Sequence, residues 1–504
     1  MTSPQKDVTP YLVVLVLIAV LGPLQFGYHL AELNAPQDVL TCASPKPPSI
    51  VSRFFSFSSK QVDNDTDCIP MTPPTFAAIS SVFTLGGLLG SLTSGPLTSR
   101  YGRLLCMRFT SLFFLVGSVI AYLATSAPAL GVSRFLTGTA AGASTVIVPL
   151  YISEVVPAER RGFFGSWTQV GVNVGILGTQ SLGYSVSEGG KGEWRWVFIV
   201  GVGIAIVQIV GLGGVVESPK WLGGVKGDVA KARRALQRIR GRSSGVEEEI
   251  ASWGVTPTPT ERQRLLDEEA EAPSLLQPVS PTRSKPITLG FLQVLTDPLT
   301  RPAILAVVGI MFAQQLCGIN SIIMYSVSLL KDLLPISSGI LTILISIINL
   351  AATIASSPLP DRLGRKTCIL LSIAGQGTSS LILALSIVFN YKLLSAFAVL
   401  FFVAFFAVGL GPVPFILASE LVGPEAVGAA QSWALGANYV ATFLVAYLFP
   451  IVNEELNRVL GGAGWVYFIF AGFAVAAGVF VTKRVPETRG KGWEEVWGRE
   501  RRVD

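Results

Sequence analysis

The sequence is short of charged residues. Only 14% of its 504 residues are Asp, Glu, Lys or Arg, whereas 50% are hydrophobic. Soluble domains average roughly 25% charged residues, and a soluble chain of this length would form about three domains that each need a charged surface. The shortage therefore excludes a soluble multidomain protein, and the mean hydropathy of +0.56 predicts a membrane protein.

Other residue types are scarce as well. The chain has one histidine and five cysteines, too few cysteines for a disulfide scaffold. We find no Walker loop, no metal-ligand cluster and no Ser, His and Asp constellation, so we expect neither an enzyme nor a cofactor. The net charge of +6 is explained by basic loops at a membrane surface, so nucleic acid is not expected as a partner.

Twelve apolar stretches approach or exceed the length of about 20 residues that a helix needs to cross a bilayer. We expect the first stretch to be retained rather than cleaved as a signal peptide, because only Lys6 precedes it and no small-residue cleavage site is present. The stretches are 11–31, 74–98, 104–125, 129–152, 163–185, 195–216, 302–330, 337–357, 366–389, 393–419, 428–450 and 463–482.

The basic residues predict the orientation. With the N-terminus inside, most of the 38 Lys and Arg residues lie in cytoplasmic segments, as the positive-inside rule requires. Both termini are then cytoplasmic, and the first outer loop carries the candidate glycosylation site Asn64. Cys42 and Cys68 share that loop, and a disulfide and two free thiols remain alternatives. A eukaryotic secretory route to the plasma membrane or a vacuole-like organelle follows.

A charged segment in the middle divides the spans into six plus six. Short motifs recur on both sides of it, because Arg100-Tyr-Gly-Arg103 returns as Arg362-Leu-Gly-Arg365 and Ser153-Glu154 returns as Ser419-Glu420. Such a repeat is a known transporter plan, with the binding site near the midplane between the halves. We expect a bundle over 1–216, a cytoplasmic linker over 217–301 (helical from 228 to 239, then Pro/Ser-rich), a second bundle over 302–482 and a cytoplasmic tail over 483–504.

Polar side chains occur at helical spacing inside five apolar spans, so each set forms a stripe on one helix face. Neutral amides donate and accept hydrogen bonds, as sugar hydroxyls do, and the stripes predict a cavity for a sugar or polyol. The alternative is hydrogen bonding between helices. The stripes are Gln25, His29 and Glu32; Gln169, Asn173 and Gln180; Gln314, Gly318, Ser321 and Tyr325; Thr342, Ser346, Asn349 and Thr353; and Gln431, Asn438 and Thr442.

Seven motifs, in the family's order, resemble the sugar porters of the major facilitator superfamily, and the first is most similar to the glucose-facilitator branch. The resemblance implies an all-α membrane fold with twelve helices in two pseudo-symmetric six-helix bundles. It also implies a monomer that carries a hexose or related sugar by alternating access. The motifs are LGPLQFGYHLAELNAPQ (21–37), YISEVVPAERRG (151–162), VESPKWL (216–222), QQLCGIN (314–320), DRLGRK (361–366), GPVPF (411–415) and VPETRG (485–490).

The same resemblance implies a central sugar site and a cytoplasmic gate of ion pairs that closes the inner side in the outward-open state. Asn320 reaches the site only if the seventh span breaks near Gly318, because in an unbroken helix it faces about 120° away from Gln314. The implied sugar site comprises Gln169, Gln314, Gln315, Asn320, Asn349, Phe415 and Asn438, and the gate comprises Arg100, Arg103, Glu154, Arg161, Arg362, Arg365 and Glu420. Phe415 departs from the family's usual Trp, and Ser99, Ala407 and Val427 depart from its usual polar or charged residues.

The single histidine leaves the mode of transport open. His29 occupies a position where facilitators have Asn and proton symporters have Asp, and the acid of the symporters faces an arginine that matches Arg134. Histidine titrates near physiological pH, which favours proton coupling, whereas the like charge of Arg134 opposes it. Three hypotheses remain: a passive sugar facilitator, a proton-coupled carrier of a sugar, polyol or related metabolite, and a non-transporting nutrient receptor.

Overall fold

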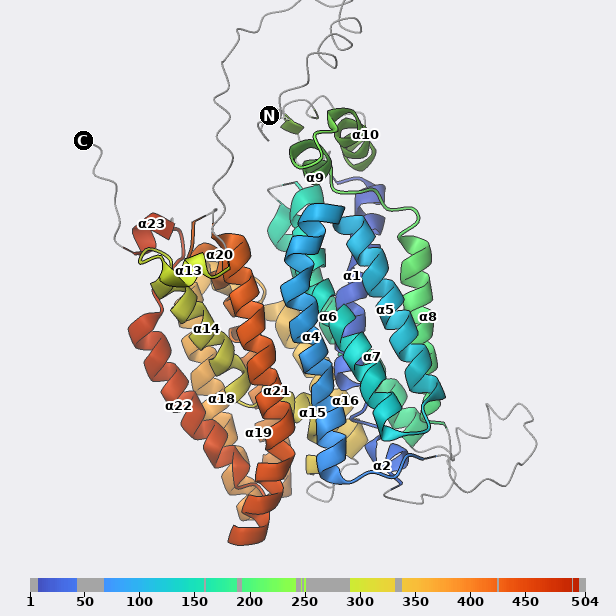
Figure 1. The fold of residues 1–504 in the computed structure, drawn as a ribbon. Helices are drawn as coiled ribbons and strands as arrows, with labels where there is room; N and C mark the ends of the chain where they lie inside the picture. Colours follow the sequence, from blue (N-terminus) through green and yellow to red (C-terminus); the bar gives the residue numbers. More distant parts are fainter. Residues whose placement is uncertain are drawn as a thin grey trace, which may run out of the picture.

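The computed structural model describes residues 8–42, 68–157, 160–187, 193–241, 246, 249–250, 291–330, 338–423, 426–491 and 493–497. Within these ranges every regular element is a helix. The long helices run roughly parallel and form two groups side by side (Figure 1). The predicted glycosylation site Asn64 and the Pro/Ser-rich part of the linker lie outside the described residues.

The first group is held together by close helix contacts at glycines. A Cβ atom at Gly138 of α6 would lie 2.0 Å from the carbonyl oxygen of Phe83 on α4, and one at Gly175 of α7 would lie 2.0 Å from that of Leu24 on α1. Only glycine permits backbones to approach this closely. The long helices are α1 (Pro10–Ala31), α4 (Pro73–Tyr101), α5 (Arg103–Leu123), α6 (Ala127–Val155), α7 (Arg161–Ser187) and α8 (Arg195–Gly211), and the short α2 (Gln37–Leu40) follows α1.

Two spans of the second group are interrupted. One bends by 42° between α14 and α15, and the other breaks between α19 and α20. Because α21 packs along α4 and α16 packs along α7, these two helix pairs join the groups. The helices are α14 (Arg301–Leu316), α15 (Ile319–Leu330), α16 (Ser338–Ser356), α18 (Arg365–Val388), α19 (Lys392–Val408), α20 (Val413–Glu420), α21 (Val427–Leu460) and α22 (Val466–Arg484).

The twelve predicted spans correspond to these helices. Nine spans of the described chain are long and apolar enough to cross a membrane, and the bent α14–α15 pair is a tenth. The two others fall short because α7 carries several amides and α8 has 17 residues. Large side chains such as Val210 (73% exposed) and Val475 (71%) lie on the outer surface, as contact with lipid tails requires.

Two predicted ends were wrong. The sixth span was expected to reach residue 216, but α8 ends at Gly211, where the glycines 211, 213 and 214 favour termination. The eleventh span was expected to end at 450, but α21 continues to Leu460. Its last turns contain Glu454 and Glu455, which lower the hydropathy without lowering helix propensity.

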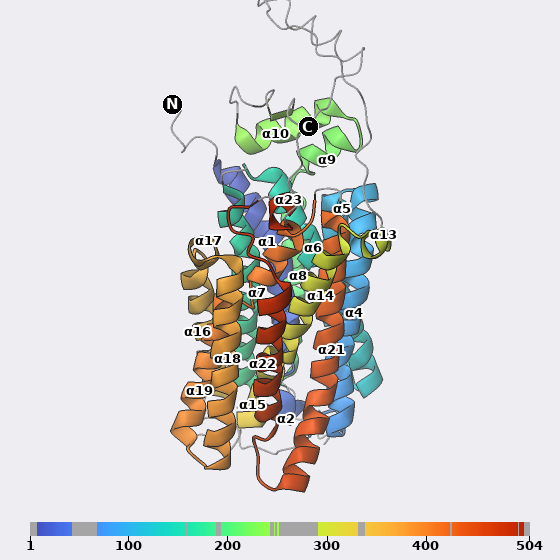
Figure 2. The same ribbon diagram turned by 90° about the vertical axis from the view of Figure 1, so that its left-hand side faces the viewer.

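Short helices lie beyond one end of the first group. Figures 1 and 2 show α9 (Pro219–Gly224) and α10 (Val229–Arg240) above the ends of α1 and α6. Asp228 caps α10 by accepting from the Lys231 N–H, and hydrogen bonds from Lys231 hold the pKa of the Asp228 carboxyl below its usual range. Arg240 donates to the Val155 carbonyl at 2.7 Å, which attaches α10 to α6. We call this end of the molecule the α10 end and the opposite one the α2 end.

Candidate functional site

Four amide side chains of the second group form one hydrogen-bonded chain. The Gln314 amide donates to two backbone carbonyls in the α19–α20 break. Its oxygen accepts from Asn438 at 2.5 Å and from Gln315 at 3.2 Å. Asn320 extends the chain by donating to Gln315 Oε1 at 2.5 Å. Three of the four residues are buried, and Asn438 is half-buried.

The seventh span breaks near Gly318, which is the condition for Asn320 to reach the proposed site. The helix α14 ends at Leu316, α15 begins at Ile319, and Gly318 between them has a φ of +98°. Only glycine adopts such a conformation without strain. The break turns Asn320 back toward α14, so that it reaches Gln315 and also donates to Thr442 Oγ1 at 3.4 Å.

A second set of amides lies between the two groups. Asn349 on α16 donates to Asn173 Oδ1 on α7 at 3.4 Å, and Asn173 donates to Thr353 Oγ1 at 2.8 Å. Gln169 lies one turn before Asn173 and is half-buried. Phe415 is half-buried on α20, packs against the core of the second group, and accepts from Gln431 through its carbonyl.

Amides also join α15 to the first group near the α2 end. The Ile323 carbonyl accepts hydrogen bonds from Asn34 at 3.0 Å and from Gln180 at 3.3 Å. The second half of an interrupted span, α15, is therefore attached to the first group by uncharged hydrogen bonds. Such bonds can be exchanged for bonds to water or ligand more easily than a buried ion pair.

A buried charged cluster lies at the C-terminal end of α1, where it meets α6. His29 Nδ1 lies 2.7 Å from Glu32 Oε2, and Arg134 donates to Glu32 Oε1 at 2.6 Å and to the His29 carbonyl. All three side chains are at most 1% exposed. The His29 ring stacks on Phe114 and the Arg134 guanidinium lies over Phe83, at 5.3 and 4.4 Å.

Glu32 is the residue of this cluster that the sequence analysis assigned no role. The sequence sets His29 against the like charge of Arg134, whereas the structure places a carboxylate between the two. Glu32 belongs to the same polar stripe as His29, and that stripe was the available signal.

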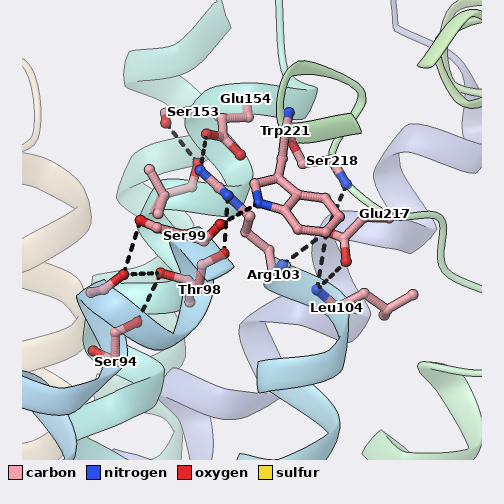
Figure 3. A network of polar contacts seen from close by, with 12 residues as sticks. Ser94, Thr98, Ser99, Arg103, Leu104, Ser153, Glu154, Glu217, Ser218 and Trp221 are labelled. Carbon is pink, nitrogen blue, oxygen red and sulfur yellow. Dashed lines mark hydrogen bonds and ion pairs between the residues drawn. The ribbon is translucent and has the colours of Figure 1, made fainter. Parts of the chain in front are cut away.

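The Arg103 cluster at the α10 end is shown in Figure 3. Arg103 forms a buried ion pair with Glu154 at 2.8 Å. Glu217 accepts from the Arg103 and Leu104 N–H groups at the start of α5, and Trp221 donates to the Ser99 carbonyl at 2.8 Å. Because free N–H groups at a helix start attract anions, Glu217 fits this position.

The second group repeats this arrangement. Arg365 pairs with Glu420 at 3.0 Å, and Glu487 accepts from the Arg365 and Lys366 N–H groups at the start of α18. Gly102 and Gly364 precede the two helices with φ of +96° and +99°. The duplicated motifs therefore occupy duplicated positions, and Glu217 and Glu487 are further residues that the sequence analysis gave no role.

The predicted gate residues are brought together only in part. The two ion pairs that form, Arg103 with Glu154 and Arg365 with Glu420, each lie within one group. Arg100, Arg161 and Arg362 are exposed and, in the part of the chain that the structure describes, make no ion pair with Glu154 or Glu420.

Near the α2 end, Cys42 and Cys68 form a disulfide with Cα atoms 5.4 Å apart.

A family model described as sugar (and other) transporter matches residues 15–497. The chain belongs to this family. It is 35% identical to a probable metabolite transport protein of Saccharomyces cerevisiae, covering 97% of this chain and 96% of that protein. It is 29% identical to solute carrier family 2, facilitated glucose transporter member 3, of Ovis aries, covering 97% and 92%.

The solved structures include the xylose transporter XylE from E. coli in a partially occluded inward open conformation. That structure has a TM-score of 0.72 and 22% identity over 96% of this chain and all of that one. Together the comparisons show an all-α, multi-pass membrane protein with the major facilitator fold of two six-helix bundles. They also place the chain among transporters rather than enzymes.

Proposed function

We propose that this protein carries a hexose or related sugar across a membrane by passive alternating access. The observation that supports this best is the chain of neutral amides around Gln314. Every member can donate and accept hydrogen bonds, and no charged side chain belongs to the chain. A sugar hydroxyl can replace any one of these bonds without leaving an ion unpaired in the interior.

The two groups supply different parts of the proposed site. Gln314, Gln315, Asn320 and Asn438 come from α14, α15 and α21, whereas Gln169 lies on α7, one turn before Asn173. Asn349 bonds across that interface to Asn173. A sugar that binds amides of both helix groups links its own binding to the relative position of the groups. Alternating access requires such a link.

Interrupted helices supply the moving parts. The span bends by 42° between α14 and α15, and this break would let α15 tilt separately from α14. In this structure α15 contacts the first group through the Ile323 carbonyl. Release of Asn34 and Gln180 from that carbonyl would free α15 and open the α2 end.

The test is uptake into proteoliposomes with a panel of labelled monosaccharides. We expect Gln314→Ala and Asn349→Ala to abolish uptake while the protein still folds and inserts into membranes. The matched control is Gln208→Ala, since Gln208 is a buried glutamine whose oxygen accepts from Gln25 within the first group. Uptake at the normal rate by both site variants would rule out this pocket.

Proton-coupled transport is the second candidate, and the Glu32 cluster favours it. Glu32 is a buried carboxylate that contacts both a histidine and an arginine. Protonation of Glu32 would weaken its pairing with Arg134 and so alter the contact between α1 and α6. Gradient-driven uptake that is lost in His29→Asn, while downhill uptake persists, would support coupling. Uptake indifferent to the gradient and to His29→Asn would leave the passive carrier.

We further propose that the α10 end is cytoplasmic, with the disulfide on the opposite, oxidising side. We also propose that the protein lies in the plasma membrane or in the membrane of a vacuole-like organelle. As a separate point, we propose that the carrier is a monomer. Protease protection of an epitope placed at either terminus in sealed vesicles tests this orientation.

A further inference from the structure

A hollow of about 380 Å³ opens near the α2 end, away from the amide chain around Gln314. The first group lines it with Gln37 of α2 and Phe76 of α4. The second group lines it with Tyr325 of α15, with the last turns of α21, and with the start of α22. Both ribbon views show α2 and α15 close to this end of the molecule (Figures 1 and 2). Its volume lies within the roughly 300–1,000 Å³ range of small-molecule pockets.

Two side chains of this lining have unsatisfied polar atoms. Gln37 Oε1 and Asn457 Oδ1 are shielded from solvent and have no hydrogen-bond partner among the described residues. A buried acceptor without a partner costs about 1–3 kcal/mol, so native structures rarely keep one without a reason. Asn453 adds a third amide and Glu454 adds a carboxylate to the same lining.

Aromatic rings form another part of the wall, and they are firmly packed. The Tyr325 ring stacks on Phe449 with centroids 5.9 Å apart, and Phe449 stacks on Phe470 at 5.8 Å. Tyr467, also in the lining, packs edge-on against Phe470 at 6.0 Å. Each of these rings is at most 6% exposed. Amide groups beside flat apolar faces suit a ligand with hydroxyls at its edge and C–H bonds on its face.

The charge of the lining narrows the ligand class further. It includes one carboxylate, that of Glu454, and its described residues contain no Lys, Arg or His. A phosphorylated or carboxylated ligand would therefore meet an unbalanced negative charge. A neutral polyol would meet the amide donors and acceptors of Gln37, Asn453 and Asn457 without such a charge conflict.

We propose that this hollow is a second, peripheral binding site for a neutral monosaccharide. The identity of the ligand rests on the proposed function, whereas the existence of the site rests on the lining alone. Because the lining comes from both groups, an occupant would join them at the α2 end. It would therefore favour the arrangement in which that end is closed, and would hold a sugar on the outer side of the central amides.

The test measures ligand protection of a reporter cysteine in purified full-length protein in nanodiscs. Ala463→Cys places the reporter in the lining without removing a polar contact. The three unpaired cysteines of the described chain are buried, so a membrane-impermeant maleimide reports on the new thiol. Glu455→Cys is the matched control, because Glu455 is exposed on α21, shortly before the loop that holds Ala463, and lies outside the hollow.

With D-glucose as the probe, we expect alkylation of Ala463→Cys to slow and that of Glu455→Cys to stay constant. Adding Gln37→Ala or Asn457→Ala should raise the glucose concentration needed for protection about fivefold each, the usual effect of one hydrogen bond. Protection should persist with Gln314→Ala, which removes the proposed central contact.

Each outcome has one interpretation. Protection that disappears with Gln314→Ala comes from occupancy of the central site and overturns the peripheral site. Glucose uptake without protection of Ala463→Cys overturns the peripheral site and leaves the proposed function intact. Protection without glucose uptake supports the site and counts against glucose transport. Absence of both rejects both for this sugar.

Discussion

Replacing Glu32 by glutamine should destabilise the protein strongly, because it removes the only carboxylate paired with Arg134 in the described chain. Arg134 is fully buried, and its guanidinium also contacts the His29 carbonyl and the Phe83 ring, neither of which carries a charge. Removing one partner of a buried ion pair costs about 3–5 kcal/mol, since the other charge stays desolvated and unpaired. That corresponds to a loss of roughly 10²- to 10⁴-fold in the ratio of folded to unfolded protein.

The measurement is reversible unfolding in mixed micelles containing increasing amounts of dodecyl sulfate. Glu455→Gln is the control for the same chemical change in an exposed pair. Glu455 and Arg458 are 54% and 73% exposed, and such pairs contribute about 0–1 kcal/mol. The double variant Glu32→Gln with Arg134→Gln should recover part of the loss, because no charge then remains unpaired. Wild-type stability of Glu32→Gln, or a double variant as unstable as the sum of the two single variants, would refute this account of the cluster.

Three further substitutions test other parts of the structure. Gly318→Ala should lower the free energy of unfolding by about 1–3 kcal/mol and slow uptake, because a residue with a side chain is strained at this φ and its Cβ would lie 2.6 Å from the Phe470 ring. Thermal unfolding measures the loss of stability, and the uptake assay measures the slower transport. Glu487→Gln should cost about 0.3–2 kcal/mol by removing an anion from the start of α18, and a thermal midpoint equal to that of the wild type would contradict this. Cys42→Ser should cost about 2–4 kcal/mol by opening the disulfide loop, while sugar uptake at low temperature stays unchanged.

Much of the fold was predictable because it depends on local patterns. Apolar length marked the twelve spans, and the repeated Arg-x-Gly-Arg motif marked the two halves. The predicted ends of α8 and α21 were wrong for a physical reason. Hydropathy reports where lipid contact stops, whereas helix ends depend on backbone hydrogen bonds and on residues such as Gly211.

The site was predictable only in part. The break at Gly318 and the position of Asn320 followed from the resemblance together with helix geometry. The pairing of Glu32 with Arg134 did not, because these residues are 102 positions apart and meet through the packing of α1 against α6. Periodicity shows that Glu32 shares a face with His29, but it does not show which neighbouring helix that face meets.

The expected gate shows the same limit. Arg161 and Arg362 share their motifs with residues that do form ion pairs, yet both are exposed. Which arginine of a motif turns inward depends on the helix start beside it, and Gly102 and Gly364 set the two starts at Arg103 and Arg365.

The two capping glutamates have a consequence for biosynthesis. Glu217 follows α8, so the ribosome has delivered every contact partner of the Arg103 cluster before α14 is synthesised. Glu487 likewise arrives only after α22. The first six-helix bundle, with all the contacts of its Arg103 cluster, can therefore be completed in the membrane while the second bundle is still being translated. Two separately translated fragments should then be able to reassemble.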